Sequence, residues 1–180
     1  SCTKISPLVD SNLPEVELPP INEVLDSLAY FDIMTWNIEQ FPIHETTVNK
    51  VISIIDSLSP KLIAFQEING NSEFNEIKNQ LILYDGHRSS SASFSINLAF
   101  FWDTSLVKNV EIYEILTWQS YALPRAPLVM ECRINNLDFV IINNHLKCCD
   151  DDGDAMRRWL ASQELKDYLD IKYDQNDKSR

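Results

Sequence analysis

Two apolar runs, each ending in a polar residue and separated by a stretch with helical periodicity, constrain the fold of this chain most strongly. The first run, residues 30–36, ends at Asn37, and the second, residues 62–66, ends at Glu67. Between them, residues 48–58 repeat apolar side chains with the spacing of a helix. A strand, a helix and a strand in this order form a right-handed unit with parallel strands. We therefore expect Asn37 and Glu67 to lie near each other, because sites in open parallel sheets lie at the carboxyl ends of the strands.

The following segments predict further strands and helices, which makes the chain an α/β protein. Ser72 is expected to cap a second helix. Residues 96–102 and 107–116 are expected to form two strands around a turn at Asp103. A last helix is expected from about residue 154 to about residue 171, with its apolar side supplied by Met156, Trp159, Leu160, Leu165, Tyr168 and Leu169.

Composition limits the classes of function. The chain has 180 residues, of which 44% are hydrophobic, so it can bury the core of one domain. Its three glycines stand apart and cannot form a glycine-rich phosphate loop. The net charge of −12 disfavours nucleic-acid binding through a broad basic surface. A bound divalent cation would still supply positive charge where a substrate phosphate lies.

The N-terminal residues predict a tether rather than a packed element. Residues 1–22 are expected to form an extended, proline-rich lead-in. Cys2 at the start suits a bacterial lipoprotein whose signal peptide ends just before the cysteine, although a stray terminal cysteine fits as well. On the lipoprotein interpretation the protein is exported, as a periplasmic, cell-surface or secreted protein, and it contacts a membrane only through an N-terminal lipid anchor.

A second pair of strand-like runs places two more polar residues together. Residues 125–134 and 137–145 are separated by two asparagines, which tolerate the positive φ of a two-residue hairpin turn. In this register Arg125 and His145 lie at the same end of the hairpin. Both side chains donate hydrogen bonds to anionic oxygens, so together they suit a phosphate. Either residue alone would more simply be explained by a structural role, such as an ion pair with an exposed carboxylate.

The same register constrains the cysteines. Cys132 lies opposite Phe139, and Cys148 then lies roughly 30 Å away along the hairpin, which excludes a disulfide between Cys132 and Cys148. Cys132 is therefore expected to be a small core residue. Cys148 and Cys149 could form a vicinal bridge, pair with another segment or stay reduced, and the sequence does not choose among these states.

Five segments in this order resemble motifs of the endonuclease/exonuclease/phosphatase superfamily: TWNIEQF, LIAFQEI, INLAFFWD, LPRAPLVMECRI and FVIINNHLK. The resemblance covers residues 31–170 and is closest to the bacterial exported or lipoprotein branch, in which a Cys-Cys pair follows the histidine. It implies half of a four-layer α/β/β/α sandwich, with mixed sheets flanked by helices. Residues 23–180 would then be the N-terminal half of such a domain.

The resemblance also implies roles for four residues. Glu67 corresponds to the metal ligand, and Asn37 corresponds to the residue that orders both the metal and the scissile phosphate. His145 corresponds to a phosphate-contacting catalytic residue, and Arg125 to a substrate-binding arginine. The implied cofactor is Mg²⁺, with Mn²⁺ or Ca²⁺ as alternatives, and the implied reaction is hydrolysis of a phosphodiester or other phosphoester, including those of nucleic acids.

Two motifs that the superfamily carries do not occur in this sequence: a later Gly-Asp-x-Asn and a terminal Asp-His pair. We therefore expect a metal-dependent phosphodiesterase or nuclease-like hydrolase whose missing C-terminal half is a required partner. The 180 residues alone are predicted to be inactive. The alternative is a catalytically inactive fragment or surface interaction module that keeps the fold. Half a sandwich should also expose an inner face that includes Met34, Met130 and Ile141.

The aspartates at positions 150–154 need a separate interpretation. They are spaced around Gly153 in a way that resembles a calcium loop, but the glycine stands too early and position 161 is Ala where a bidentate Glu belongs. A solvated loop in which Asp154 caps the following helix explains them better, with bound Ca²⁺ left as the alternative. The histidines at positions 44 and 87 are expected in loops as ordinary surface residues.

Overall fold

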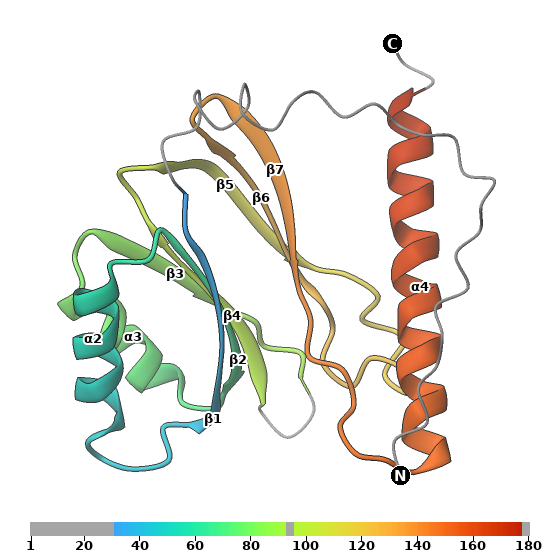
Figure 1. The fold of residues 1–180 in the computed structure, drawn as a ribbon, viewed down its shortest axis with the longest axis horizontal. Helices are drawn as coiled ribbons and strands as arrows, with labels where there is room; N and C mark the ends of the chain where they lie inside the picture. The colour runs from blue at the N-terminus through green and yellow to red at the C-terminus, as the bar shows by residue number, and fades with distance from the viewer. Residues whose placement is uncertain (1–30, 93–95, 178–180) are drawn as a thin grey trace, which may run out of the picture. The chain divides into compact units, whose positions relative to one another are not determined.

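The computed structural model describes residues 31–92 and 96–177, so the predicted lead-in at residues 1–22 and Cys2 lie outside the described residues. The described part contains two β-sheets with helices on their outer faces (Figure 1). In chain order the elements are β1 (Ile33–Phe41), α2 (Thr47–Leu58), β2 (Leu62–Ile68), α3 (Asn71–Gln80), β3 (Tyr84–Arg88), β4 (Asn97–Asp103), β5 (Val107–Glu114), β6 (Leu128–Ile134), β7 (Leu137–Asn143) and α4 (Asp152–Asp177).

The predicted strand, helix, strand unit is confirmed. Strands β1 and β2 pair in parallel, and the first sheet has the order β1-β2-β4-β3 with its other pairs antiparallel. The second sheet is antiparallel, with the order β5-β6-β7. The turn that begins after Asp103 leads from β4 in the first sheet to β5 in the second. The chain is therefore an α/β protein, as predicted, but only one of its two sheets is mixed, whereas we expected mixed sheets.

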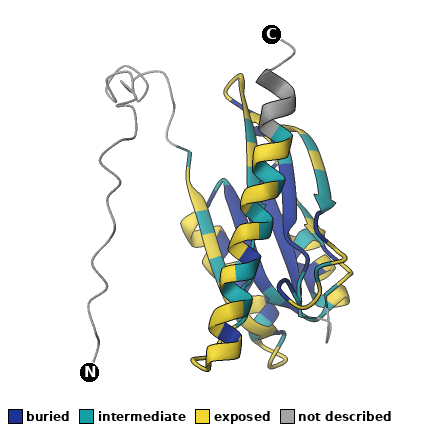
Figure 2. Ribbon diagram, turned by 90° about the vertical axis from the view of Figure 1, so that its right-hand side faces the viewer, coloured by how far each residue is buried: buried dark blue, intermediate teal, exposed yellow. Residues whose placement is uncertain are grey.

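Three apolar clusters separate the layers in the order helix, sheet, sheet, helix (Figures 1 and 2). Helices α2 and α3 pack on the outer face of the first sheet around Val51, Ile55, Phe65, Phe74 and Phe101. The inner faces of the two sheets meet around Leu62, Phe100, Leu128, Met130 and Cys132. Helix α4 covers the outer face of the second sheet around Leu123, Val129, Ala161, Leu165 and Tyr168. This layering is that of an α/β/β/α sandwich.

The inner face that we expected to be exposed is covered, which corrects that prediction. Met130 is fully buried between the sheets, and Met34 faces the helix layer instead of the second sheet. The reason is that the described residues supply strands to both sheets, so the two inner faces cover each other. The sheets end at β1 and β7, and Phe31 and Phe139 stack with ring centroids 6.4 Å apart near the starts of these two strands.

The predicted hairpin register is confirmed, but its strands are shorter than expected. Cys132 pairs with Phe139, and Asn135 and Asn136 have φ values of 49° and 67°. Strand β6 begins at Leu128 and β7 ends at Asn143, so Arg125 and His145 lie in the loops beyond the ladder. Arg125 stands between two prolines, which cannot donate ladder hydrogen bonds, and this explains why pairing starts later.

The helix boundaries differ from the prediction at both predicted caps. Gly70 occupies the N-cap position of α3, so Ser72 lies in the first turn, where its hydroxyl donates to Glu73. The backbone N–H of Asp154 donates to Asp151 Oδ1 over 2.7 Å, which makes Asp151 the capping side chain of α4. A carboxylate three residues earlier is the better acceptor for a first-turn N–H.

Helix α4 also differs from the prediction in length and in the side that it buries. It continues past residue 171 to Asp177. Met156 and Trp159, expected on the apolar side, are 52% and 57% exposed, whereas Ala161 is buried against the sheet. None of the helices in the described residues is apolar over a length that would span a bilayer.

Candidate functional site

Three side chains from distant parts of the sequence meet beside the first sheet: Asn37 within β1, Glu67 near the end of β2, and His145 in the loop after β7. Asn37 Nδ2 lies 3.3 Å from Glu67 Oε1 and donates a hydrogen bond to it. His145 Nε2 lies 3.5 Å from the same carboxylate oxygen, and both side chains of this second pair are 17% exposed. The predicted convergence of Asn37, Glu67 and His145 is therefore present in the structure. Their roles in catalysis and metal binding stay predictions.

A bulge in β2 turns Glu67 toward this cluster. Residues of a regular strand alternate between the two faces, so Glu67 should face the helix layer together with Ile63 and Phe65. Ile68 also packs in the helix-side core, which shows that the alternation changes phase across Gln66 and Glu67. The pairing register with β4 shifts at the same place, and Glu67 has φ of 66°. Bulges that re-aim a side chain are common beside functional sites.

A second irregularity, in β1, brings one backbone donor to the Glu67 carboxylate and another to the Asn37 side chain. Strand β1 continues past Asn37, contrary to the prediction that it ends there, and Glu39 and Gln40 have φ values of 32° and 53°. The Gln40 N–H donates to Glu67 Oε2 over 3.1 Å, and the Glu39 N–H donates to Asn37 Oδ1 over 3.0 Å. Backbone held in this sparsely populated region costs about 1–3 kcal/mol per residue and occurs preferentially at functional sites.

A buried amide pair links the two sheets next to the cluster, and sequence reasoning missed it. Gln66 Nε2 donates to Asn143 Oδ1 over 2.8 Å, and Asn143 Nδ2 donates to the carbonyls of Phe65 and Ala99 over 2.8 and 3.1 Å. Gln66 immediately precedes Glu67, and Asn143 lies two residues before His145. The only feature of the sequence that could have indicated it is that Gln66 and Asn143 are amides at the ends of runs that are otherwise apolar.

The electrostatics on the His145 side favour a neutral imidazole that faces an anion. Burial lowers the pKa of His145, the nearby Arg125 guanidinium lowers it further, and the Glu67 carboxylate acts in the opposite direction. Arg125 Nε and His145 Nδ1 are buried without a hydrogen-bond partner among the described residues. Arg125 is therefore close enough to act on His145, as the hairpin prediction required, although both residues lie in loops.

The residues at Glu67 fit a divalent cation of the Mg²⁺ type. Mg²⁺ is usually held by one or two carboxylates, with waters and substrate phosphates completing its shell. An ionised carboxylate has about four acceptor sites, and three of those on Glu67 face Asn37, Gln40 and His145. Within residues 31–92 and 96–177, no group of three or more His, Cys, Asp or Glu side chains could hold a metal. Glu67 would therefore hold the cation without a cluster of three or more such side chains among these residues.

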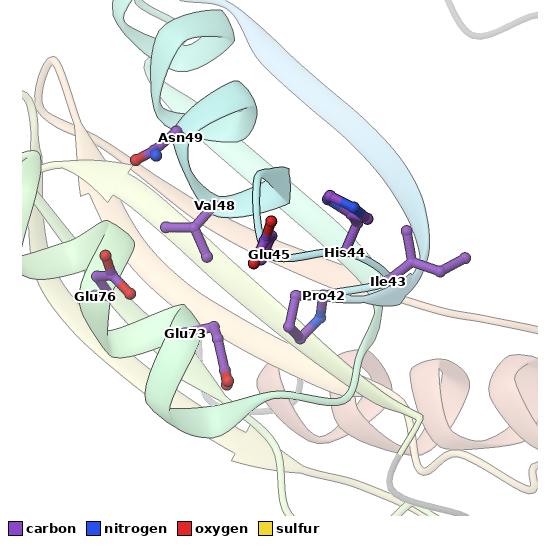
Figure 3. Close-up of a pocket in the computed structure, with 8 residues that line it drawn as sticks. All are labelled: Pro42, Ile43, His44, Glu45, Val48, Asn49, Glu73 and Glu76. Carbon is purple, nitrogen blue, oxygen red and sulfur yellow. The ribbon is translucent and has the colours of Figure 1, made fainter.

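A pocket of about 440 Å³ lies at a different place, between the loop after β1 and helix α3 (Figure 3). It is lined by Pro42, Ile43, His44, Glu45, Val48, Asn49, Glu73 and Glu76. Its three glutamates make it unsuitable for a phosphate.

His44 lies in the loop, as predicted, whereas His87 lies in β3, which the sequence analysis did not predict. Both histidines are exposed.

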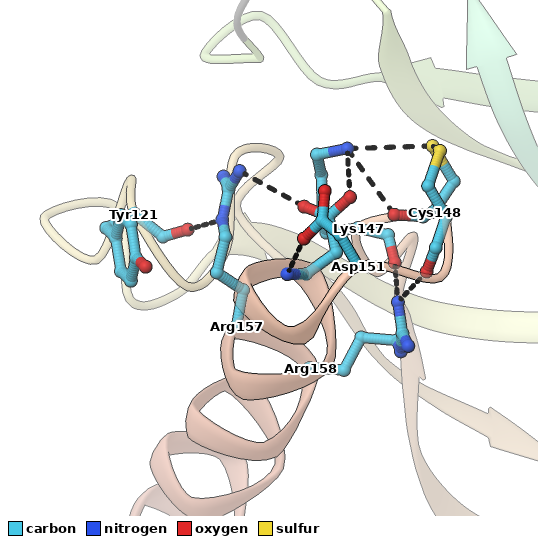
Figure 4. A network of polar contacts seen from close by, with 8 residues as sticks. Tyr121, Lys147, Cys148, Asp151, Arg157 and Arg158 are labelled. Atoms are coloured by element: carbon cyan, nitrogen blue, oxygen red, sulfur yellow. Dashed lines mark hydrogen bonds and ion pairs between the residues drawn. The ribbon is translucent and has the colours of Figure 1, made fainter.

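The acidic loop before α4 is a capping and ion-pairing structure (Figure 4). Asp151 caps the helix, and Asp154 is buried, with Lys147 Nζ at 3.1 Å and Arg157 Nη1 at 3.8 Å. Arg157 also donates to the carbonyl of Tyr121 and lies over its ring. The Asp154 carboxylate is therefore neutralised by protein cations, which favours the capping interpretation of this loop over a calcium site.

Comparison with solved structures shows which fold this is. The chain matches D. rerio TDP2 complexed with a single-strand DNA product at TM-score 0.63 and 17% identity, covering 79% of this chain and 54% of that one. It matches the human Nocturnin catalytic domain with bound sulfate at TM-score 0.61 and 15% identity, covering 78% and 58%. It matches an endonuclease/exonuclease/phosphatase from Bacteroides vulgatus at TM-score 0.53 and 12% identity, covering 77% and 61%.

The chain thus has the fold of these structures, one of which is described as an endonuclease/exonuclease/phosphatase. This confirms the fold that the sequence motifs implied. The chain spans between about half and three fifths of the length of these three structures. No protein-family model matches the sequence, and no curated protein does.

Proposed function

We propose that this chain supplies one half of the active site of a divalent-metal-dependent phosphoester hydrolase of the phosphodiesterase or nuclease type. The observation that carries the proposal is the Glu67 carboxylate at the end of β2, with Asn37, the Gln40 N–H and His145 arranged around it. A strained backbone at Glu67 and a bulge that changes its side are difficult to explain by packing alone.

Each residue has a distinct role in this proposal. Glu67 holds Mg²⁺, and Asn37 positions both Glu67 and the phosphate. His145, kept neutral by burial and by Arg125, donates a hydrogen bond to a phosphate oxygen. Arg125 supplies the fixed positive charge on the substrate side, and its buried Nε needs an acceptor. When bound, the metal would polarise a phosphoryl oxygen and offset the negative charge of this acidic chain.

Nucleic acid is the substrate class that we favour within the phosphoesters. One of the similar structures, TDP2, is described with a single-strand DNA product, and the Nocturnin domain holds a sulfate anion, which has the charge and shape of a phosphate. The mannosyl-6-phosphatase from Bacteroides thetaiotaomicron, with TM-score 0.56 and 9% identity, supports a sugar phosphate as the second candidate.

Turnover is proposed to need the C-terminal half of the domain as well. The chain covers 54% of the D. rerio TDP2 chain and 58% of the Nocturnin chain, and the Gly-Asp-x-Asn and Asp-His motifs are absent from its sequence. Export as a lipoprotein anchored at Cys2 remains part of the proposal, supported by the sequence alone. The second candidate function is an interaction module, which the gene sequence after residue 180 distinguishes, because a hydrolase requires both motifs there.

Calorimetry with Mg²⁺ tests the metal assignment on the 180-residue chain itself. Glu67→Gln should abolish the binding heat, whereas Glu111→Gln, which removes an equal charge from an exposed position on β5, should leave it unchanged. In the complete protein, Glu67→Gln should also abolish Mg²⁺-dependent cleavage of single-stranded DNA. Equal Mg²⁺ affinity in Glu67→Gln and the unmodified chain would contradict the assignment.

Cleavage by the unmodified 180 residues would contradict the proposed need for a second half.

A further inference from the structure

Two adjacent thiols lie in the loop between β7 and α4, in a position that the proposed hydrolase site does not use. Cys148 and Cys149 are exposed and free, and their Sγ atoms lie 2.8 Å apart (Figure 4). Adjacent cysteines usually direct their side chains apart along an extended chain, because successive side chains alternate. Here the positive φ of Cys149, 83°, accompanies two thiols that face each other.

A lysine places positive charge beside one of the two thiols. Lys147 Nζ lies 3.7 Å from Cys148 Sγ, and it also donates to Asp154 Oδ2 over 3.1 Å. Asp154 is buried at the start of α4, so it fixes the ammonium group in place. A neighbouring cation favours the thiolate, which is the reactive form of cysteine.

The two thiols are not equivalent. The hydrogen bond between the two thiols and, less strongly, the charge of Lys147 lower the pKa of Cys148, whereas the same hydrogen bond raises the pKa of Cys149. Cys132 differs from both, because burial raises its pKa to about 11 and it is 4% exposed. The geometry and the charges therefore select Cys148 as the attacking thiol and leave Cys149 next to it.

The backbone that carries the thiols is fixed from the helix. Arg158 Nη1 donates to the carbonyl of Cys149 over 2.7 Å and to the carbonyl of Lys147 over 3.2 Å. Figure 4 shows this arginine reaching from the first turns of α4 to the loop. These hydrogen bonds hold the loop in the conformation that brings the two sulfur atoms together.

We propose that Cys148 and Cys149 form a dithiol site for thiol–disulfide exchange with a low-molecular-weight disulfide of the oxidised-glutathione type. The Cys148 thiolate attacks one sulfur of the disulfide, whose S–S bond breaks and releases one thiol, leaving a mixed disulfide on Cys148. Cys149 then loses its proton and attacks Cys148 Sγ, which releases the second thiol and closes an intrachain disulfide. In total the two cysteines lose two electrons and two protons, and the oxidant gains them as two thiols.

The test follows the reaction of the whole chain with oxidised glutathione by mass spectrometry after rapid alkylation. All variants carry Cys2→Ser, so that the cysteine outside the described residues cannot pair. The parent chain should become two hydrogens lighter, with both cysteines of the bridge in one tryptic peptide. Cys149→Ser should stop at a glutathione adduct on Cys148, and Cys148→Ser should react about tenfold more slowly.

Two controls separate this site from general thiol reactivity. Lys147→Gln should slow adduct formation roughly twofold to fivefold, and the effect should shrink at high salt. Cys132 should stay unmodified in the folded chain, because it is buried and its pKa is raised. Equal rates for Cys148→Ser and Cys149→Ser, a parent chain that stops at the mixed adduct, or disulfide-linked dimers as the main product would each overturn the proposal.

Discussion

Gln66 and Asn143, which come from different sheets and lie 77 residues apart in the sequence, share a buried hydrogen bond of 2.8 Å. The two amides satisfy one another and three backbone carbonyls, those of Ala64, Phe65 and Ala99. Buried polar groups fix an arrangement because any sliding of the layers would leave them unpaired. This pair therefore sets the relative position of β2 and β7, and with it the distance between Glu67 and His145.

Removing the Asn143 amide should destabilise the fold. Asn143→Ala leaves Gln66 and two carbonyls without their buried partner, and we expect the free energy of unfolding to fall by about 1–3 kcal/mol. Urea denaturation measures this loss. Asn49→Ala, at an exposed position of α2, should change stability by less than about 0.5 kcal/mol. A loss at Asn143 no larger than at Asn49 would show that the amide pair does not hold the sheets in place.

The left-handed backbone at Glu67 should be visible as strain in a pair of variants. Glycine adopts φ of 66° without the steric cost of a Cβ, so Glu67→Gly should be more stable than Glu67→Ala by about 1 kcal/mol. At Glu111, which pairs with Glu131 just after a bulge in β5 and is not among the residues with positive φ, the same pair should have the opposite order, because glycine within a strand costs about 0.5–1 kcal/mol relative to alanine. Thermal unfolding of the four variants gives both differences. The same order at both positions would contradict strain at Glu67.

Methionines at two positions should respond very differently to truncation. Met130 is fully buried between the sheets, and Met130→Ala should lower the free energy of unfolding by about 2–5 kcal/mol through lost contacts and the cavity left behind. Met156 is 52% exposed on α4, and Met156→Ala should stay within about 0.5 kcal/mol of the parent. Guanidinium denaturation of both variants measures these changes in the free energy of unfolding. Losses of similar size in the two variants would contradict the assignment of Met130 to the layer between the sheets.

Acid should weaken the contact between α4 and the second sheet. The hydrogen bonds from Lys172 and Tyr113 lower the pKa of Glu131 below its ordinary value of 4.5. The unfolded chain therefore takes up this proton first as the pH falls. The stabilisation by Glu131 is fully present above pH 4.5 and is lost as the pH falls through the folded pKa.

The pH dependence of unfolding measures this linkage. The stability difference between the parent and Glu131→Gln should be largest near neutral pH and should shrink below pH 4.5. Glu45→Gln, in the exposed loop after β1, provides the matched control and should show no such change. A constant difference between the parent and Glu131→Gln across the titration would rule out the ion pair as a source of stability.

The sequence predicted those parts of the structure that depend on periodicity. The strand, helix, strand unit before Glu67 and the hairpin that pairs Cys132 with Phe139 both follow from alternation and turn chemistry, and both are confirmed. The meeting of Asn37 with Glu67 followed from the rule that parallel strands end at one edge. These predictions needed only local patterns and general topology rules.

The features that the sequence did not predict depend on contacts between distant segments. The bulges at residues 38–40 and 66–67 contain no glycine to mark them, and the hydrogen bond from the Gln40 N–H to Glu67 joins residues that are 27 positions apart in the sequence. Strand β3 contains charged residues and a glycine and pairs only at an edge. Met156 and Trp159 fit a helical apolar pattern, yet the sheet contacts the opposite side of α4.

The two strands that carry Asn37 and lead to His145 are also the last strands of their sheets, each with one neighbour among the described residues. Their outer backbone donors and acceptors can therefore be used as a template by any further strand. A strand that joined β1 would place the residue opposite Asn37 beside it, and one that joined β7 would add side chains on the His145 side. Completion of either sheet and completion of the active site would then be a single assembly event.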